Sequence, residues 1–330
     1  AIPGGAGGLG PLLADPLTRD GHTVAVVDIQ RPYEAWRLHE GARGAVRMVD
    51  HSLFRVALPS GREVAYYWMY AENFDFSGYD VVIDAAIGSA DRPMGLTSPR
   101  EVAWANLSVP LSVYARYGER AAPVIIYPSS FNAMYGHQVI TPRKLPDPAN
   151  AYGWTKAAAE LLYRALAREK EARVVITRVG SAYGPKGRSD ELPHRLILDM
   201  LSGKERVVVR SPRARRLWTY SKDVAAFYSR LLERLDLRPG EIRVYHVAGN
   251  RAPGVVENVE LARIVAKVVG WEGEIVSGVY EPGEALPGPG GPAPIEFRYE
   301  TDLEPRYTLE DGLRETVEWF RGPGRRFYAL

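Results

Sequence analysis

A tyrosine and a lysine four residues apart, Tyr152 and Lys156, are the pair in this chain best suited to proton transfer. They lie in residues 149–171, a run of Ala, Leu, Glu and Arg without proline, which predicts a helix capped by Asn150. On a helix this spacing puts both side chains on one face, where the lysine ammonium favours the ionised phenol and lowers its pKa. Such a tyrosine can give and take a proton near neutral pH. An ordinary surface helix also carries such pairs, so the surrounding elements decide between the two interpretations.

A glycine-rich run at residues 4–10 precedes a predicted helix and a buried strand at residues 23–28. This β–α–β setting is typical of a dinucleotide-binding turn, in which the pyrophosphate rests on the helix N-terminus. Asp28 ends the strand, where an acid accepts hydrogen bonds from the adenosine ribose and favours NAD over NADP, although Arg31 keeps NADP open. The residues of the turn predicted to contact the cofactor are Gly4, Gly7, Gly8, Leu9 and Gly10.

Strands and helices alternate through the first half of the chain, which predicts an α/β fold with a doubly wound parallel sheet, the Rossmann fold. Further strands are predicted at residues 46–50, 79–87, 123–128 and 173–178. Because such sheets bind ligands at the carboxyl ends of their strands, side chains at these ends are candidate ligands. These strand ends complete the predicted cofactor site with Asp50, Ala85, Ala86 and Val179, and the family resemblance described below implies the helix residue Asn106 as well.

The alternation loosens after residue 178. Residues 1–178 are therefore predicted to form an NAD-binding domain, to which residues 218–249 return, and residues 179–330 a smaller C-terminal substrate-binding region. Within this region residues 181–185 are predicted as a turn, and residues 282–294 as a Pro/Gly-rich loop. Residues 210–216 concentrate arginines, either as a solvated basic loop or as a clamp for a diphosphate.

These motifs resemble those of the extended short-chain dehydrogenase/reductase superfamily, in its branch of NAD-dependent nucleotide-sugar epimerases and dehydratases. The run GGAGGLG resembles its GxxGxxG, YGWTKAAAE its YxxxK helix and RVGSAYGP its RxxNxYGP. The resemblance implies a tightly held NAD, a Tyr152 that moves a proton at the sugar hydroxyl, and a Lys156 that binds the nicotinamide ribose. A UDP-hexose 4-epimerase of this kind oxidises the C4 hydroxyl, lets the keto-sugar rotate and returns the hydride to the other face.

The third catalytic residue of the family, a serine or threonine, is not at its usual distance from Gly136. Counting back from that glycine reaches Phe131, which cannot hydrogen-bond a sugar hydroxyl, whereas a one-residue bulge assigns Ser130; we favour Ser130. Dehydratases usually carry an Asp-Glu pair after their catalytic threonine, and here Asn132 and Ala133 cannot deprotonate a carbon acid. This favours an epimerase.

The resemblance also implies a nucleotide-sugar substrate. The predicted substrate-binding residues are Ser130, Asn132, Ser181, Arg216 and Arg298. Two alternatives stay open: a dehydratase, reductase or other short-chain oxidoreductase that exchanges free cofactor, and a non-catalytic NAD-binding protein, suggested by Phe131.

Composition excludes several other classes of function. A net charge of +2 gives no reason to expect nucleic acid or membrane as a partner, and the chain has no cysteine. Six scattered histidines lack metal-ligand spacing, so no metal site is predicted. We expect a cytoplasmic protein, because no apolar run is long enough to span a membrane. By resemblance we expect a homodimer through the helices that carry Asn106 and Tyr152, with an apolar face formed by Val113, Leu161, Leu162, Tyr163 and Leu166.

Overall fold

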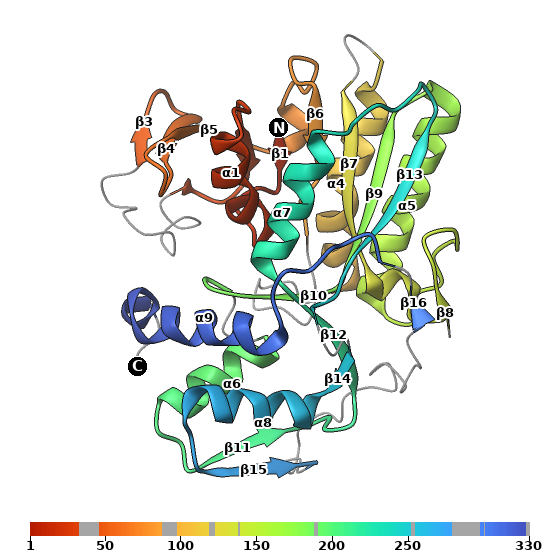
Figure 1. The fold of residues 1–330 in the computed structure, drawn as a ribbon. Helices are drawn as coiled ribbons and strands as arrows, with labels where there is room; N and C mark the ends of the chain where they lie inside the picture. The colour runs from red at the N-terminus through yellow and green to blue at the C-terminus, as the bar shows by residue number, and fades with distance from the viewer. Residues whose placement is uncertain are drawn as a thin grey trace. The chain divides into compact units, whose positions relative to one another are not determined.

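The computed structural model describes residues 1–32, 46–87, 98–118, 123–137, 139–187, 191–251, 255–278, 298–299 and 301–327. The predicted loop at residues 282–294 lies outside these residues. The chain divides into two compact units (Figure 1). Unit 1 comprises Ala1–Gly136, Pro142–Val179 and Ala225–Tyr245, and unit 2 comprises His137–Thr141, Gly180–Val224 and His246–Leu330. No helix of the described part is both long and apolar enough to cross a membrane.

Unit 1 is built on an open sheet with the strand order β3-β4-β5-β2-β1 on one side and β6-β7-β9-β13 on the other. The two halves are joined between β1 and β6, where the amides of Ile83 and Ala85 donate to the carbonyls of Ala1 and Pro3, each at 2.9 Å. The strands are β1 (Ile2–Pro3), β2 (Ala25–Asp28), β3 (Val46–Met48), β4 (Leu53–Ala57), β5 (Glu63–Trp68), β6 (Val81–Ile83), β7 (Val124–Ser130), β9 (Val174–Val179) and β13 (Ile242–Val247).

The order of the strands confirms the predicted doubly wound fold. From β1 the chain runs outward through β2 to β5, then returns to β6 and runs the other way through β7 to β9. The pairs β1–β2, β2–β5, β6–β7 and β7–β9 are all parallel. The direction of winding therefore reverses between β1 and β6, which is where doubly wound sheets bind their ligands.

The strand predicted at residues 46–50 is present over residues 46–48, but it is not a parallel strand of the doubly wound sheet. Residues 46–48 form β3, which pairs antiparallel with β4, and β4 pairs antiparallel with β5. Arg47 and Met48 are exposed, as expected at a sheet edge, whereas strands inside a parallel sheet are buried on both faces. The third parallel strand is β5, which contains most of the aromatic run at residues 66–70.

Local sequence signals place the helices of unit 1. Asn150 caps α5 by accepting from Gly153 N, as predicted, and Ser98 with Glu101 forms a capping box at the start of α4. Both helices pack apolar side chains against the sheet; Val109 and Val113 of α4 and Leu166 of α5 belong to one core cluster with β6, β7 and β9. The helices are α1 (Leu9–Arg19), α4 (Pro99–Arg116), α5 (Ala151–Lys170) and α7 (Ser221–Leu232), with 3-10 helices η1 (Ala71–Asn73) and η2 (Phe131–Met134).

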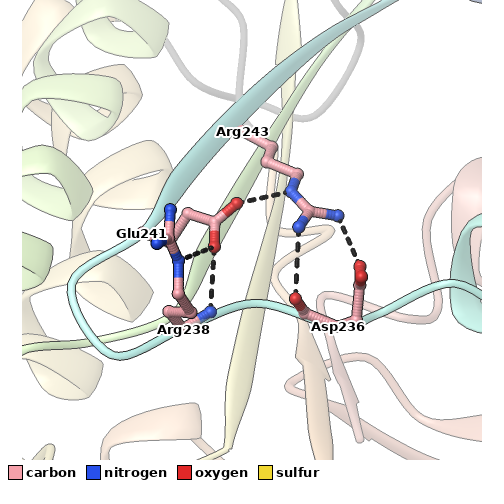
Figure 2. A network of polar contacts seen from close by, with 4 residues as sticks. All are labelled: Asp236, Arg238, Glu241 and Arg243. Carbon is pink, nitrogen blue, oxygen red and sulfur yellow. Dashed lines mark hydrogen bonds and ion pairs between the residues drawn. The ribbon is translucent and has the colours of Figure 1, made fainter.

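A surface network of charged side chains lies in the loop from α7 to β13 and at the start of β13 (Figure 2). Arg243 donates through Nε to Glu241 Oε1 at 2.7 Å and through Nη1 to Asp236 Oδ1 at 2.8 Å. Glu241 also accepts from Arg238 N at 2.9 Å. Since β13 is at the edge of the sheet, its charged Arg243 also disfavours pairing with a further strand.

Unit 2 is smaller, and its described residues form three short sheets. Its central sheet has the order β10-β12-β14, and β11 pairs parallel with β15 and β8 with β16. Residues 181–183, predicted as part of a turn, instead pair with β12. Helices α6, α8 and α9 share one apolar core with these strands. The elements are β8 (Val139–Ile140), β10 (Ser181–Tyr183), α6 (Leu192–Leu201), β11 (Arg206–Val209), β12 (Arg215–Tyr220), β14 (Val255–Glu257), α8 (Asn258–Val269), β15 (Glu274–Ser277), β16 (Arg298–Tyr299), α9 (Leu309–Arg321) and η3 (Pro323–Phe327).

Candidate active site

The glycine-rich turn joins β1 to α1 at the point where the sheet reverses. Gly4 has a φ of +70°, and a Cβ built on it would lie 2.3 Å from Ala86 Cα, so only glycine fits against the end of β6. A Cβ on Gly10 would lie 2.0 Å from Gly5 O, which explains the glycine inside the first turn of α1. Gly8 is exposed, and its Cβ position has no heavy atom within 4 Å. The backbone at Gly8 is therefore open to a ligand, whereas the backbone at Gly4 and Gly10 is tightly packed.

Asp28 lies at the end of β2 and is buried. Its carboxylate accepts from Ala6 N and from Gln30 N, each at 2.9 Å, so it holds the glycine-rich turn against β2. Burial raises the pKa of Asp28, and the backbone hydrogen bonds act in the opposite direction. Arg31, which had kept NADP open, lies with its guanidinium carbon 4.9 Å from the centroid of the Trp68 ring.

Asp50 does not lie at the end of a parallel strand, as the sequence had suggested. It lies in the turn between β3 and β4, and its carboxylate oxygen accepts from the backbone amides of Ser52 and Leu53 at 2.8 Å. These hydrogen bonds lower the pKa of Asp50. Two strands, β4 and β5, separate β3 from β2, so we remove Asp50 from the predicted cofactor site.

Lys156 is almost fully buried, and its ammonium joins α5 to the ends of two strands. Nζ donates to Pro128 O of β7 at 3.1 Å and to Ala86 O, just after β6, at 3.4 Å. It also lies 4.9 Å from the centroid of the Tyr127 ring, within the range of a cation–π interaction. The structure thus brings the predicted residues Lys156 and Ala86 together.

A buried carboxyl group that the sequence did not single out lies in the same region. Asp84 is 1% exposed and accepts from Tyr163 Oη at 2.7 Å and from Ala86 N at 3.2 Å. Burial raises the pKa of Asp84 to about 6, while the positive charge of Lys156 and the Tyr163 hydrogen bond act in the opposite direction. Asp84 therefore supplies a nearby negative charge for the buried ammonium of Lys156.

Tyr152 lies in the first turn of α5 and is half-buried. Thr155 donates through Oγ1 to the carbonyl of Tyr152 at 2.8 Å, and it accepts from Asn106 Nδ2 at the same distance. Asn106 is buried on α4, so this pair of hydrogen bonds ties α4 to the turn of α5 that carries Tyr152. The predicted residue Asn106 thus supports the start of α5.

At the end of β7 the structure separates the two candidates for the third catalytic residue. Phe131 is 1% exposed and points into the protein as the first residue of η2. Ser130 is half-buried, caps η2, and is in register with Val179 at the end of β9. The 3-10 turn begins directly after the strand, which is why counting back from Gly136 leads to a core residue.

With this geometry in place, the chain can be compared with known proteins. The profile of the NAD-dependent epimerase/dehydratase family matches residues 1–248. The chain belongs to this family. It is 31% identical to dTDP-glucose 4,6-dehydratase of Streptomyces niveus over a match that covers 53% of this chain and only 49% of that protein.

Two further proteins match nearly the whole length of the chain. It is 24% identical to UDP-glucuronic acid decarboxylase 1 of Xenopus tropicalis, covering 97% of this chain and 71% of that protein. Its fold is similar to a crystal structure of UDP-glucose 4-epimerase from Thermotoga maritima with UDP-glucose, with a TM-score of 0.73 at 20% identity and 98% coverage of both chains. The family and the Rossmann fold predicted from the motifs are thereby confirmed.

NAD is the cofactor of this family, and the residues of unit 1 fit it. The glycine-rich turn leaves the backbone open at Gly8, next to the first turn of α1, where a phosphate is favoured. Asp28 presents a carboxylate at the end of β2, where the adenosine ribose is expected. Lys156 and Ala86 lie on the opposite side of the switch point, which suits the nicotinamide half of the cofactor.

The predicted substrate-binding residues of this family member fall in both units. Ser130 and Asn132 are in unit 1, at the end of β7 and in η2. Ser181 and Arg216 are in unit 2, on the neighbouring strands β10 and β12, and Arg298 is on β16. Within unit 2, β12 also pairs with β14, where Arg216 is in register with Val256.

A fully buried ion pair that was not predicted from the sequence supports α5. Glu160 of α5 and Arg178 of β9 form a salt bridge at 2.9 Å with both side chains fully buried, and Ser129 Oγ donates to Glu160 at 2.5 Å. Arg178 also donates to Lys144 O at 2.9 Å. The signal was present in the sequence, because Glu160 is one helical turn after Lys156 and Arg178 is a charged residue within an apolar strand.

Proposed function

We propose that the protein is an NAD-dependent nucleotide-sugar 4-epimerase that acts on a UDP-hexose. The observation that carries the proposal is the set of polar groups around the start of α5. Tyr152 and Lys156 lie on this helix, Ser130 ends the adjacent strand, and neither Asn132 nor Ala133 provides an acid. Proton transfer at one hydroxyl is therefore available, and a second acid for elimination is lacking.

Each residue has a defined role in this proposal. NAD, when bound, supplies the hydride acceptor and donor. Tyr152 takes the proton from the C4 hydroxyl of the sugar and later returns it. Lys156 holds the ribose of the cofactor and favours the phenolate of Tyr152 through its positive charge. Ser130 hydrogen-bonds the oxygen at C4, so that this oxygen stays in place during oxidation and reduction.

The residues after Ser130 argue against a 4,6-dehydratase. Asn132 has no titratable group, and its amide is hydrogen-bonded to both Ser130 and Asn150. Ala133 is fully buried. A dehydratase needs an acid and a base here to remove a proton from carbon and expel water, which these two side chains cannot do.

The substrate nucleotide is proposed to contact unit 2. Arg216 is half-exposed on β12 and would pair with the diphosphate through its forked donors. Ser181 occupies the position where the family often has an asparagine, and its hydroxyl would replace the amide of that asparagine as a hydrogen-bond donor. Arg298 is a further candidate for binding the diphosphate.

The proposal is tested by incubating NAD-loaded protein separately with UDP-glucose, UDP-galactose, and the corresponding GDP-, CDP- and dTDP-hexoses. Proton NMR of the sugar should show conversion to the C4 epimer without net formation of NADH. Tyr152→Phe serves as the control, and it should abolish the conversion. If a 4-keto-6-deoxy sugar accumulates, or NADH forms in proportion to substrate, the epimerase assignment is wrong and a dehydratase or net oxidoreductase replaces it.

We also propose a homodimer through α4 and α5, with a revised apolar face. Tyr163, Leu166 and Val113 were expected in this face, but they are buried in the core of unit 1. The exposed apolar residues lie at spacings of seven: Trp104 and Leu111 on α4, and Trp154 and the predicted residue Leu161 on α5. Light scattering should show a dimer that becomes a monomer in Leu111→Glu; a wild-type monomer would remove the proposal.

A further inference from the structure

A chain of hydrogen bonds connects the start of the catalytic helix to Ser130. Gly153 N, in the first turn of α5, donates to Asn150 Oδ1 at 2.8 Å, and Asn150 Nδ2 donates to Asn132 Oδ1 at 2.8 Å. Asn132 then donates twice to Ser130 Oγ, through Nδ2 and through its backbone N, each at 3.2 Å. We call Gly153, Asn150, Asn132 and Ser130 the amide relay.

The direction of every hydrogen bond in the amide relay follows from its first member. A backbone N–H can only donate, so the atom of Asn150 that faces Gly153 must be the amide oxygen. The other end of Asn150 is then the NH₂ group, which has to face the oxygen of Asn132. The NH₂ group of Asn132 is thereby turned towards Ser130. The orientations of both amides are fixed by the helix rather than free to flip.

These fixed orientations determine which way the Ser130 hydroxyl can donate and accept hydrogen bonds. A hydroxyl has one proton and two lone pairs, and Asn132 occupies both lone pairs of Ser130 Oγ. Within the described residues, the hydroxyl proton of Ser130 is donated to no protein atom. Ser130 is half-buried at the end of β7, so this proton is left to face a ligand.

We infer that Asn132 and Asn150 are positioning residues that hold Ser130 as a hydrogen-bond donor, and never an acceptor, towards the oxygen at the reacting carbon of the substrate. This inference rests on the proposed function, because it assigns Ser130 to that oxygen. It also moves Asn132 from the predicted substrate-binding residues to a role that acts through Ser130.

Packing around the amide relay keeps it in place. A Cβ on Gly153 would lie 2.2 Å from Asn132 O, so the first turn of α5 lies directly against η2. Asp147 N donates to Ala133 O at 2.8 Å, and Gly136 N donates to Asp147 O at 2.7 Å, which fastens the segment between η2 and α5. A preorganised donor of this kind costs no reorganisation when charge develops on the substrate oxygen.

Because Ser130 can only donate, it decides between two possible routes for the proton of the substrate hydroxyl, one through Ser130 and one directly to Tyr152. If Ser130 passed the proton on, its oxygen would have to accept the proton of the substrate while its own proton moved to Tyr152. With both lone pairs occupied, Ser130 cannot accept. The hydroxyl proton of the substrate therefore moves directly to Tyr152, and Ser130 keeps its own proton. NAD, when bound, would accept the hydride that the carbon loses.

The test uses Asn132→Asp in the NAD-loaded protein with UDP-glucose as substrate. The aspartate keeps the shape of asparagine and still accepts from Asn150, but it replaces the donor facing Ser130 with an acceptor, so the serine proton turns away from the substrate. We expect kcat at pH 8 to fall about 100-fold, the usual effect of losing one preorganised donor, with KM within about threefold of wild type. The matched control is the same substitution in a Ser130→Ala background.

In the Ser130→Ala background, Asn132→Asp should change kcat by less than about threefold, because the donor it reverses is already gone. If the aspartate lowers kcat equally with and without the serine, its charge acts on Tyr152 directly and the inference is overturned. A rise in KM with unchanged kcat would make Asn132 a substrate-binding residue and would overturn it as well.

A second measurement does not depend on turnover. In Asn132→Ala, Asn150 loses its acceptor, so hydrogen exchange at the Gly153 amide, measured by ¹⁵N NMR, should accelerate about tenfold. Asn132→Asp and Ser130→Ala should leave this rate unchanged. Unchanged exchange in Asn132→Ala would show that the amide relay does not hold the helix start. If UDP-glucose is not converted while exchange responds as expected, the proposed function fails and the amide relay stands.

Discussion

Two networks in unit 1 use the same chemical groups in opposite surroundings. In one, Glu160 and Arg178 form an ion pair with neither side chain exposed, and Ser129 and the carbonyl of Lys144 complete it. In the other, Glu241 and Arg243 form an ion pair at the surface with side chains 22% and 29% exposed (Figure 2). The two carboxylate–guanidinium contacts are similar in length, at 2.9 and 2.7 Å.

The difference in burial decides what each pair does. At the surface, water replaces a lost partner, so an exposed pair contributes little to stability. In the interior no water is at hand, and a charge that loses its partner stays desolvated. The buried pair therefore fixes the position of α5 relative to β9, and the surface pair only shapes the turn before β13.

The largest effect is expected from removing one half of the buried pair. Glu160→Ala leaves the Arg178 guanidinium charged and unpaired in the core, and should lower the free energy of unfolding by about 3–5 kcal/mol. Urea unfolding followed by circular dichroism measures this loss. The matched surface variant is Glu241→Ala, which should leave the urea midpoint nearly unchanged; equal losses in the two variants would contradict the distinction drawn between the networks.

A smaller effect is expected when the pH is changed. Raising the pH should lower the stability contribution of the buried Asp84 but increase that of the surface carboxylates. Burial raises the pKa of Asp84 to about 6, above its ordinary value of 3.8, so the folded protein binds this proton more tightly than the unfolded chain. The contribution of Asp84 to stability is therefore present below pH 4 and is lost as the pH rises through 6. A shift of this size corresponds to about 3 kcal/mol.

Asp84→Asn should remove this loss. Its stability relative to wild type is expected to increase between pH 4.5 and pH 7, as measured by urea unfolding at several pH values. Tyr163→Phe, which removes the hydrogen bond to Asp84 but leaves the carboxyl group, is the control and should keep the pH dependence. A difference between Asp84→Asn and wild type that is constant with pH would argue that Asp84 does not titrate in this range.

The smallest effect is expected in the surface network. Hydrogen bonds from Arg243 lower the pKa of Asp236, and the backbone amide of Arg238 together with Arg243 lowers the pKa of Glu241. The contribution of these carboxylates is therefore present near neutral pH and is lost as the pH falls below about 4. Arg243→Ala should lower the melting temperature by no more than about 2 °C at pH 7, and by less at pH 3. Differential scanning calorimetry at the two pH values measures this, and a loss that grows towards acid pH would be the wrong sign.

The sequence was sufficient where a local signal determines the local structure. Asn150 predicted the start of α5, and the glycine-rich run was predicted to precede a helix, which is where β1 turns into α1. In each case one or two neighbouring residues satisfy the backbone, so no information from the rest of the fold is needed.

The sequence was insufficient where partners are far apart along the chain. The strand before Asp50 was taken for a parallel one, because a short apolar run does not show which other strand it will pair with, or in which direction. Residue counting could not separate Ser130 from Phe131, because the 3-10 turn after β7 sets which side chain is buried. Glu160, Arg178 and Asp84 gain their roles only when α5, β9 and β6 pack together.

Unit 1 receives its last strand late. Ala225–Tyr245, which includes most of α7 and the part of β13 that belongs to unit 1, follows a long segment of unit 2 in the chain. During synthesis, β9 therefore leaves the ribosome well before the strand that covers its edge, while unpaired strand edges are open to wrong partners. Until residue 245 has emerged, β13 cannot cover the edge of β9, so this edge of the nascent unit 1 stays open to pairing with another strand.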